Sequence, residues 1–349
     1  MFISIDSPIG MSGYSKAVRE LFYSLNQIGK ESYMFVPENA PFMYVPEKIH
    51  RHIIRTMPKL SEKDVLFFRP YFSPIPSVKA KLIANVVLES TRLPERLVRE
   101  CNDNRVNQVW VPSKHCYDIA ENCGIIEDKL RIVPHGYDPE IFSYKPIKHD
   151  NFVFLFVGGY VGRGDRKGAD LLVEAWNSWK DRPQDVVCHM KINTTYSVSG
   201  WKPENWSRDL GGDGIIVNPM NYIDKEMANI YNVADCFVNP SYGEGFNMSL
   251  LEAMACGLPV ISSLFGGQKD YLNEVIHNDP RFFALMTETI PAKFSPWDCG
   301  SWEKPDFECL VNSLKWAYED KPKKKPYSHL KEWTWKKSVI IAKKCLEEL

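Results

Sequence analysis

Short apolar runs alternate with amphipathic stretches along most of the chain. The first apolar run is Phe2–Asp6, a glycine-bearing turn follows at Ser7–Gly13, and Tyr14–Ile28 then repeats apolar residues at helical spacing. A strand, a glycine turn and a helix in this order are typical of the opening of a Rossmann-like unit. Because the G-x-G-x-x-G pattern is absent, a tight turn that binds no ligand is an equal alternative for this segment.

The same alternation continues in two series that are separated by a linker at about residues 139–150. Helical stretches between the runs predict parallel sheets with both faces covered. In the first series we expect strands at Ser32–Val36, Val65–Phe68, Ile83–Leu88, Gln108–Val111 and Leu130–Val133. In the second series we expect them at Phe152–Val157, Val186–Ile192, Ile215–Asn218, Cys236–Asn239 and Val260–Ser263. The pattern therefore predicts an α/β protein, and residues 280–305 have no clear pattern.

The most informative stretch lies between two strands of the second series. Ser241–Phe246 is a loop with two glycines, and a helix of strong helix formers begins at Asn247 or Met248 and ends at Gly257. Phosphate oxygens can accept from the free N–H groups of Asn247, Met248, Ser249 and Leu250. Two carboxylates with seven residues between them, Glu244 and Glu252, can face the same cleft. The stretch predicts an anion site between two carboxylates.

These residues carry a resemblance to a known family. Glu244-Gly245-Phe246, followed by Glu252-Ala-Met-Ala-x-Gly-x-Pro-Val, resembles the signature of the family 4 retaining glycosyltransferases of the GT-B fold. The resemblance implies that Glu244 holds sugar hydroxyls of a nucleotide sugar and Glu252 holds the ribose. It also implies that Gly245, Phe246 and the amides of residues 247–250 lie at the donor diphosphate. The family commonly has Gly and Pro where this chain has Asn247 and Ser249, which leaves the donor's identity open.

A second match lies in the glycine-rich loop after Phe152–Val157. Gly158-Gly159, then Lys167-Gly168 and a helix at Ala169–Trp179, are similar to the family segment that neutralises the leaving diphosphate. The resemblance implies that Lys167 and an arginine supply the positive charge and that Gly159 lies in the donor site. The usual arginine position holds Gly162, so Arg163 and Arg166 are both candidates. A solvated basic loop is the alternative for either arginine.

Other landmarks of the family recur in the expected order. Met220 and Tyr222 lie in a segment that resembles the one near the nucleotide base, and Gly13 would approach the diphosphate from the opposite side of the cleft. GT-B proteins of this kind consist of two Rossmann-like domains facing a central cleft. The resemblance therefore implies an N-terminal domain of residues 1–148, a nucleotide-sugar-binding domain of residues 149–333, and a final helix, residues 334–349, that packs back on the first domain.

Three residues are candidates for the acceptor side. Glu89 and Arg92 directly follow a predicted strand, at the edge where open α/β sheets bind ligands. Glu89 would hold an acceptor hydroxyl or cap the next helix. His135 lies in Val133–Asp138, which resembles the exit from the N-terminal domain, and is expected to be structural rather than catalytic.

Composition and charge limit the partners and the location that we expect, and they leave the predicted fold as it is. The 349 residues have a net charge of −1, so no overall field points to nucleic acid or membrane. Nine scattered cysteines predict reduced thiols, and the absence of a basic leader or a long apolar run predicts a cytoplasmic protein without a transmembrane segment. No D-x-D occurs, which fits a site that uses cationic groups and N–H donors instead of a metal. No cofactor is expected, because the nucleotide sugar is a substrate.

The resemblance implies transfer of a hexose-type sugar, with retention, from a UDP- or GDP-sugar to an acceptor hydroxyl. The acceptor is open between a glycan, a lipid, a small molecule and a modified DNA base, and peripheral membrane contact is compatible with the sequence. A basic stretch, Lys48, Arg51, Arg55 and Lys59, indicates either a phosphate-bearing acceptor or an ordinary solvated face. The alternatives are a phosphorylase or epimerase of the same fold and a non-catalytic nucleotide-sugar-binding paralogue.

Overall fold

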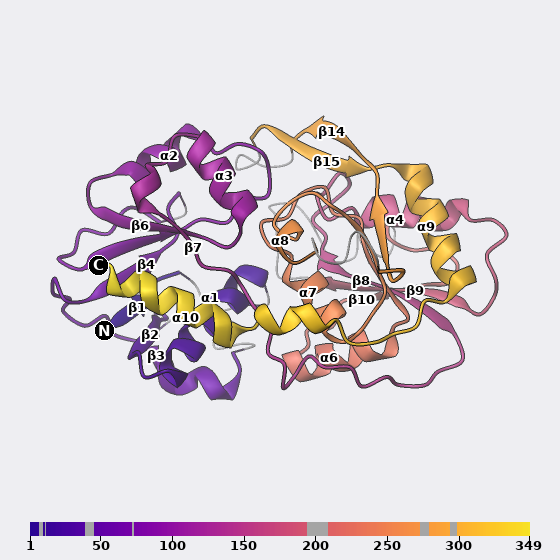
Figure 1. Cartoon of the computed structure of the whole chain (residues 1–349), viewed down its shortest axis with the longest axis horizontal. Coiled ribbons are helices and arrows are strands. Elements are labelled where there is room, and N and C mark those ends of the chain that lie inside the picture. Colours follow the sequence, from indigo (N-terminus) through magenta and orange to yellow (C-terminus); the bar gives the residue numbers. More distant parts are fainter. Residues whose placement is uncertain are drawn as a thin grey trace.

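Two parallel sheets with helical covers lie side by side (Figure 1). The computed structural model describes residues 1–6, 10, 12–38, 45–71, 73–193, 209–272, 279–293 and 299–349. Part of the predicted turn at Ser7–Gly13, residues 7–9 and 11, therefore lies outside the described residues. The α/β class predicted from the sequence is confirmed.

The first sheet has the strand order β3-β2-β1-β4-β5-β6-β7, and all neighbours are parallel. Its strands are β1 (Phe2–Ser4), β2 (Ser32–Phe35), β3 (Ile53–Ile54), β4 (Val65–Phe68), β5 (Lys81–Asn85), β6 (Val106–Val111) and β7 (Leu130–Ile132). The α-helices of this half are α1 (Gly13–Gln27), α2 (Glu95–Asn102) and α3 (Lys114–Asn122). The strand predicted at Ile83–Leu88 begins two residues earlier and ends at Asn85, where the loop toward the cleft starts.

The second sheet has the order β10-β9-β8-β11-β12-β13, again with parallel neighbours. Its strands are β8 (Phe152–Gly159), β9 (Val186–Asn193), β10 (Ile215–Asn218), β11 (Cys236–Asn239), β12 (Val260–Ser263) and β13 (Phe282–Leu285). Its helices are α4 (Ala169–Ser178), α6 (Asp224–Val233), α7 (Met248–Ala255), α8 (Lys269–Leu272) and α9 (Phe307–Asp320). Strands β10, β11 and β12 have the predicted bounds.

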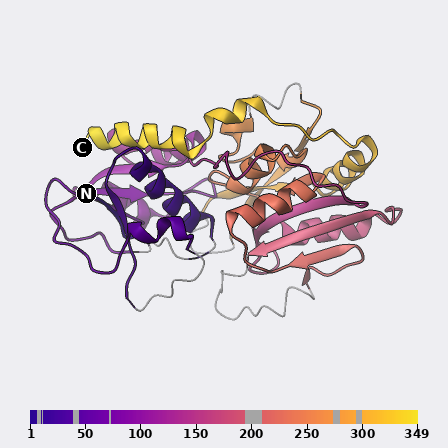
Figure 2. The ribbon, with the colours of Figure 1, turned by 90° about the horizontal axis from the view of Figure 1, so that it is seen from below.

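One helix returns from the second half to the first. After a short 3-10 helix at Ser328–Glu332, α10 (Trp335–Glu347) crosses to the first sheet and packs beside α1, as Figures 1 and 2 show. Trp335, Val339 and Ala342 are buried in the same core as Phe2 and Phe22. The Gln108 side chain also donates a hydrogen bond of 2.8 Å to the Cys345 carbonyl. The last helix therefore completes the hydrophobic core of the first half.

An antiparallel hairpin that the sequence did not predict, β14 (Thr287–Pro291) and β15 (Ser301–Pro305), reaches the other half. The Thr91 N–H donates to the Ser301 carbonyl over 3.1 Å, and the Ser301 N–H donates to Thr91 Oγ1 over 2.8 Å. Nearby, a Cβ added to Gly243 would lie 2.0 Å from the Glu89 carbonyl oxygen, so the two backbones touch there. The halves are thus joined beside the cleft by backbone contacts.

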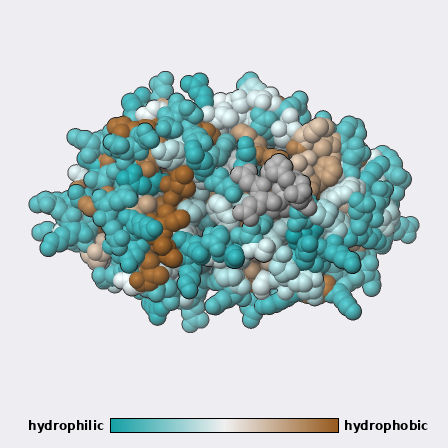
Figure 3. Space-filling model, in the orientation of Figure 1, coloured by the Kyte–Doolittle hydropathy of each residue, from teal (hydrophilic) through white to brown (hydrophobic). Residues whose placement is uncertain are grey.

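The remaining features agree with the composition. Cys101, Cys116, Cys188 and Cys236 are buried free thiols, and hydrophilic residues cover most of the face drawn in Figure 3. In the part of the chain that the structure describes, no helix is both long enough and apolar enough to cross a bilayer.

Candidate functional site

The loop after β11 leads into α7 through one residue of unusual conformation. Asn247 has a φ of 68°, in the left-handed region, and its Oδ1 accepts a hydrogen bond of 3.3 Å from the Leu250 N–H. Asparagine tolerates this conformation better than other residues with a Cβ, which explains why it can stand where the similar family commonly has glycine. Because the cap uses the Leu250 N–H, that amide is already bonded, while the Leu250 side chain lies in the core.

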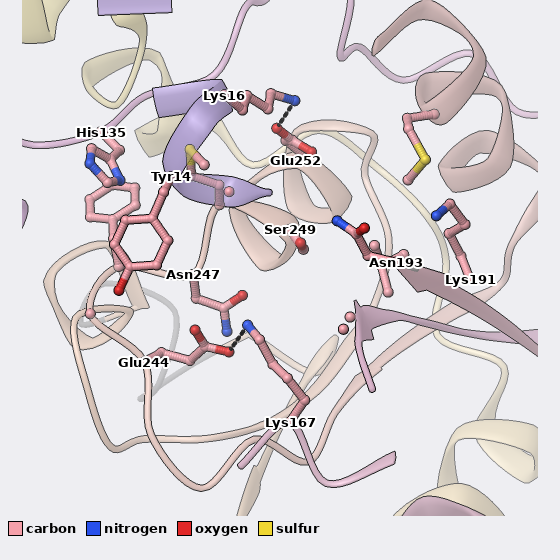
Figure 4. A pocket seen from close by; sticks show the side chains of 18 of the residues that line it. Tyr14, Lys16, His135, Lys167, Lys191, Asn193, Glu244, Asn247, Ser249 and Glu252 are labelled. Atoms are coloured by element: carbon pink, nitrogen blue, oxygen red, sulfur yellow. Dashed lines mark hydrogen bonds and ion pairs between the residues drawn. The ribbon is translucent and has the colours of Figure 1, made fainter. Parts of the chain in front are cut away.

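Glu244 lies at the start of this turn and is nearly fully buried. Lys167 Nζ lies 2.6 Å from one carboxylate oxygen (Figure 4). A guanidinium nitrogen of Arg166 lies 3.4 Å from the other. Burial alone would raise the pKa of Glu244, but the charges of Lys167 and Arg166 outweigh it and lower the pKa. The Glu244 carboxylate is therefore ionised and can accept hydrogen bonds from hydroxyl groups.

Lys167 and Arg166 are placed by the loop between β8 and α4. Gly168 has a φ of 69°, and a Cβ there would lie 2.2 Å from the Pro240 carbonyl oxygen, so glycine alone fits after Lys167. The Arg166 carbonyl accepts from the Tyr242 N–H over 2.7 Å, which anchors the loop to the segment that carries Glu244. Arg166 also forms an ion pair with Glu89, whereas Arg163 is exposed and does not line the cleft.

The other carboxylate, Glu252, is held from the opposite half of the molecule. Lys16 on α1 lies 2.5 Å from Glu252 and 2.8 Å from Asp224 on α6. The Tyr231 hydroxyl donates to Glu252 over 3.3 Å. Burial raises the pKa of Glu252 to about 7, although Lys16 acts against this shift. Glu252 therefore changes its charge close to neutral pH.

These groups surround a cleft with a cavity volume of about 190 Å³ between the two halves. It brings together most of the residues singled out from the sequence: Gly13, Glu89, His135, Gly159, Arg166, Lys167, Tyr222, Glu244, Gly245, Phe246, Asn247, Met248, Ser249 and Glu252. Four others lie apart from its lining: Arg92, Arg163, Met220 and Leu250.

Glu89 and His135 each had a structural role as the alternative to a role in the site. Glu89 does not cap α2, because that helix begins at Glu95 after Pro94, and the carboxylate pairs with Arg166 instead. The His135 ring packs on Phe246 and Trp335, with centroid distances of 5.2 and 5.9 Å. Burial lowers the pKa of His135 to about 3, so the ring is neutral at physiological pH.

Several lining residues were missed by the sequence analysis: Tyr14, Lys16, Arg19, Lys191, Asn193, Asp224 and Tyr231. Lys191 and Asn193 come from the carboxyl end of β9, beside the glycines of β8. A lysine within an otherwise apolar strand is the one signal that the sequence offered for Lys191. Lys16 and Asp224 have no comparable signal, because only the folded chain brings them to Glu252.

Comparison with known proteins decides the architecture. Residues 151–288 match the family model described as glycosyl transferases group 1. HepE of Anabaena, solved in complex with UDP-glucose, superposes with a TM-score of 0.71 at 14% identity, covering 100% of this chain and 99% of that one. A sucrose-phosphate synthase from Thermosynechococcus elongatus gives a TM-score of 0.66 at 17% identity, covering 99% of this chain and 98% of that one. The fold is GT-B.

Curated proteins match parts of the chain with higher identity. A D-inositol 3-phosphate glycosyltransferase from Paenarthrobacter aurescens is 29% identical over 203 residues, 53% of this GT-B chain and 48% of that protein. A mannosylfructose-phosphate synthase from Agrobacterium fabrum is 26% identical over 163 residues, 43% of this chain and 36% of that protein. The chain spans about half or less of the length of these relatives. The resemblance to the group 1 glycosyltransferases is confirmed.

Proposed function

We propose that this chain is a retaining glycosyltransferase that moves a hexose-type sugar from a nucleotide diphosphate sugar to an acceptor hydroxyl. The observation that carries the proposal is the ion pair of Lys167 and Glu244, 2.6 Å long, beside the first turn of α7 in the cleft between the halves. A carboxylate for sugar hydroxyls and a cation for a phosphate thus lie side by side, where free helix N–H groups also point.

The same groups suit the chemistry of the transfer. As the bond from the anomeric carbon to the diphosphate oxygen breaks, negative charge grows on the diphosphate, and Lys167 and the first N–H groups of α7 stabilise that charge. The acceptor oxygen bonds to the anomeric carbon on the face that the diphosphate leaves, and the hydroxyl proton passes to a diphosphate oxygen. Glu244 orients the sugar through its hydroxyls rather than attacking the anomeric carbon.

The proposed donor is a UDP- or GDP-hexose, and the proposed acceptor is a phosphate-bearing polyol. The donor is supported by the nucleotide complexes of HepE, and the acceptor by the names of the two curated relatives. The basic stretch near β3 offers a further contact, because Arg51 is exposed, while Lys48 is bound to Glu20 over 3.1 Å. If this stretch attracts the acceptor, its Michaelis constant will rise with salt, and Arg51→Glu with Arg55→Glu will flatten that response.

A two-step assay tests the function. Nucleotide sugars are first ranked by thermal shift, and the best donor is then incubated with D-inositol 3-phosphate, hexose phosphates, neutral glycans, lipids and hydroxymethylated DNA. We expect release of the nucleoside diphosphate and a product with the donor's anomeric configuration by NMR. An inverted product would overturn the retaining assignment. Turnover with inorganic phosphate alone would indicate a phosphorylase, a rearranged nucleotide sugar an epimerase, and binding without turnover a non-catalytic paralogue.

A further inference from the structure

One buried cation of the cleft stands out among the described residues. Lys191, at the carboxyl end of β9, is 6% exposed, and its ammonium donates a hydrogen bond of 3.1 Å to the Ile192 carbonyl. Among the described residues no carboxylate forms an ion pair with it, and burial alone lowers its pKa, to about 8. An ammonium taken out of water without an anion carries a desolvation cost that a charged ligand can offset.

The carboxylates of the described cleft lining are already paired with cations. The four carboxylates that line it are Glu89, Asp224, Glu244 and Glu252. Glu252 and Asp224 share Lys16, and Glu89 and Glu244 share Arg166, while Glu244 also holds Lys167. Within the part of the chain that the structure describes, none of these four carboxylates is left for Lys191.

The neighbours of Lys191 leave room for a ligand and include polar side chains. In the sheet Lys191 lies beside Val157, and Asn193 lies beside Gly159, which has no side chain to keep a ligand away. Figure 4 shows the ammonium of Lys191 turned toward Asn193, on the wall opposite Ser249 at the start of α7. Asn247 directly precedes α7. Its side-chain nitrogen is buried and has no hydrogen-bond partner among the described residues.

We propose that Lys191 binds phosphate oxygens of the nucleoside diphosphate. Its ammonium would pair with the ligand instead of with a carboxylate of the protein. The proposal rests on the proposed function for the identity of the donor. The anion chemistry itself follows from the buried ammonium, which has no carboxylate partner among the described residues, and from its place in the lining of the same cleft as Lys167. Because Lys191 lies outside the glycine-rich loop that carries Lys167, it would contact the diphosphate from a different strand of the sheet.

The test compares Lys191→Met with the unchanged protein by titration calorimetry. The probes are UDP, uridine and inorganic pyrophosphate. We expect the variant to bind UDP and pyrophosphate at least ten times more weakly, because a hydrogen bond to a charged group is lost. Uridine affinity should change less than twofold. Lys343→Met, which removes an exposed lysine of α10, should bind all three probes as the unchanged protein does.

The melting temperature without ligand separates binding from a structural role. Methionine fills the space of the lysine stem without a buried charge, so Lys191→Met should melt at the same temperature or higher. A lower melting temperature together with unchanged UDP affinity would make Lys191 structural. Equal loss for uridine and UDP would also overturn the proposal, since it would place Lys191 at the nucleoside.

A pH series adds a readout specific to this ammonium. Other groups facing the cleft also titrate or carry charge: Lys16 and Arg19 on α1, Glu89, His135, Arg166, Lys167, His189 on β9, Asp224 and Tyr231 on α6, Glu244 and Glu252. Their effects cancel in the ratio of the affinities of the unchanged protein and Lys191→Met. That ratio should fall severalfold between pH 8 and 9.5 as Lys191 loses its proton. Lys191→Arg, which stays charged, should keep its affinity across this range.

The two proposals can fail separately. If pyrophosphate binds in a Lys191-dependent way but no nucleotide sugar does, the anion site stands and the proposed function is wrong. If nucleotide sugars are turned over and Lys191→Met binds UDP and pyrophosphate as tightly as the unchanged protein, the function stands and the role of Lys191 is wrong.

Discussion

Lys16 and Glu252 form an ion pair across the cleft, with 2.5 Å between Nζ and Oε1, although 236 positions separate them in the sequence. Lys16 belongs to α1 of the first half, and Glu252 to α7 of the second. Since Lys16 also holds Asp224, one ammonium serves two carboxylates from different helices. A ribose that hydrogen-bonds to Glu252 would have to share this carboxylate with Lys16, so closure of the halves and nucleotide binding would act on the same group.

Glu252 makes stability depend on pH. Its pKa in the folded protein is about 7, against an ordinary value of 4.5, so between these values the folded state keeps a proton that the unfolded state loses. The free energy of unfolding therefore falls from pH 4.5 to 7, by roughly 3 kcal/mol from this group, and the cost is fully present above pH 7. In Glu252→Gln, the free energy of unfolding measured with urea should no longer show this decrease between pH 5 and pH 8.

The control for that experiment is Glu95→Gln, because the Glu95 side chain is 94% exposed. It should keep the pH dependence of the unchanged protein. Equal slopes for Glu252→Gln and the unchanged protein would contradict the shifted pKa.

Lys167→Ala removes the cation nearest to Glu244. We expect turnover to drop by about two to three orders of magnitude, because a main stabiliser of the leaving diphosphate is lost. UDP affinity should fall as well, while Lys180→Ala, an exposed lysine just after α4, should change neither quantity. Full turnover in Lys167→Ala, measured as nucleoside diphosphate release, would rule out its proposed role.

Glu244 and Glu252 should differ in what they contribute to donor binding. Glu252→Ala should weaken UDP binding roughly tenfold or more, because hydroxyl groups lose a charged acceptor. Glu244→Ala should bind UDP within about twofold of the unchanged protein but lose transfer of the sugar. Calorimetry with UDP and a turnover assay separate the two effects, and equal UDP affinities in both variants would refute the division.

Gly243→Ala tests the contact between the halves. The added Cβ would lie 2.0 Å from the Glu89 carbonyl oxygen and 3.0 Å from the Trp302 ring, so backbone must move. We expect the loops that carry Glu89 and Glu244 to separate and turnover to fall at least tenfold, with a loss of stability of about 1–3 kcal/mol. If Gly243→Ala had the turnover and melting temperature of the unchanged protein, the contact would not be needed for activity or stability.

The parts of the fold buried on both faces could be predicted from sequence. Strand β4 and the first three residues of β11 are continuous apolar runs, and every residue of both strands is buried, so pattern and structure coincide. Strand β14, by contrast, is largely exposed, and its residues show no apolar alternation. This strand forms through its pairing with β15 and its contact with the first half. A local sequence pattern does not predict such contacts.

The site divides in the same way. Glu244, Glu252 and Lys167 lie in two continuous segments whose spacing carries the chemistry. Lys16 and Lys191 come from α1 and β9, and only the packing of the halves and the order of the strands bring them to the cleft. The sequence did not distinguish Arg163 from Arg166 as the arginine of the site. In the structure, the hydrogen bond from the Tyr242 N–H to the Arg166 carbonyl holds Arg166 at the cleft.

The return of α10 to the first sheet has a consequence for synthesis. Residues 335–347 leave the ribosome only after both sheets have been translated, yet Trp335, Val339 and Ala342 belong to the core that contains Phe2 and Phe22. Until then, the surface that α10 covers beside α1 is open to solvent and to other nascent chains, which favours misassembly of large proteins. The half that is synthesised first can therefore complete its core only after the last helix has been made.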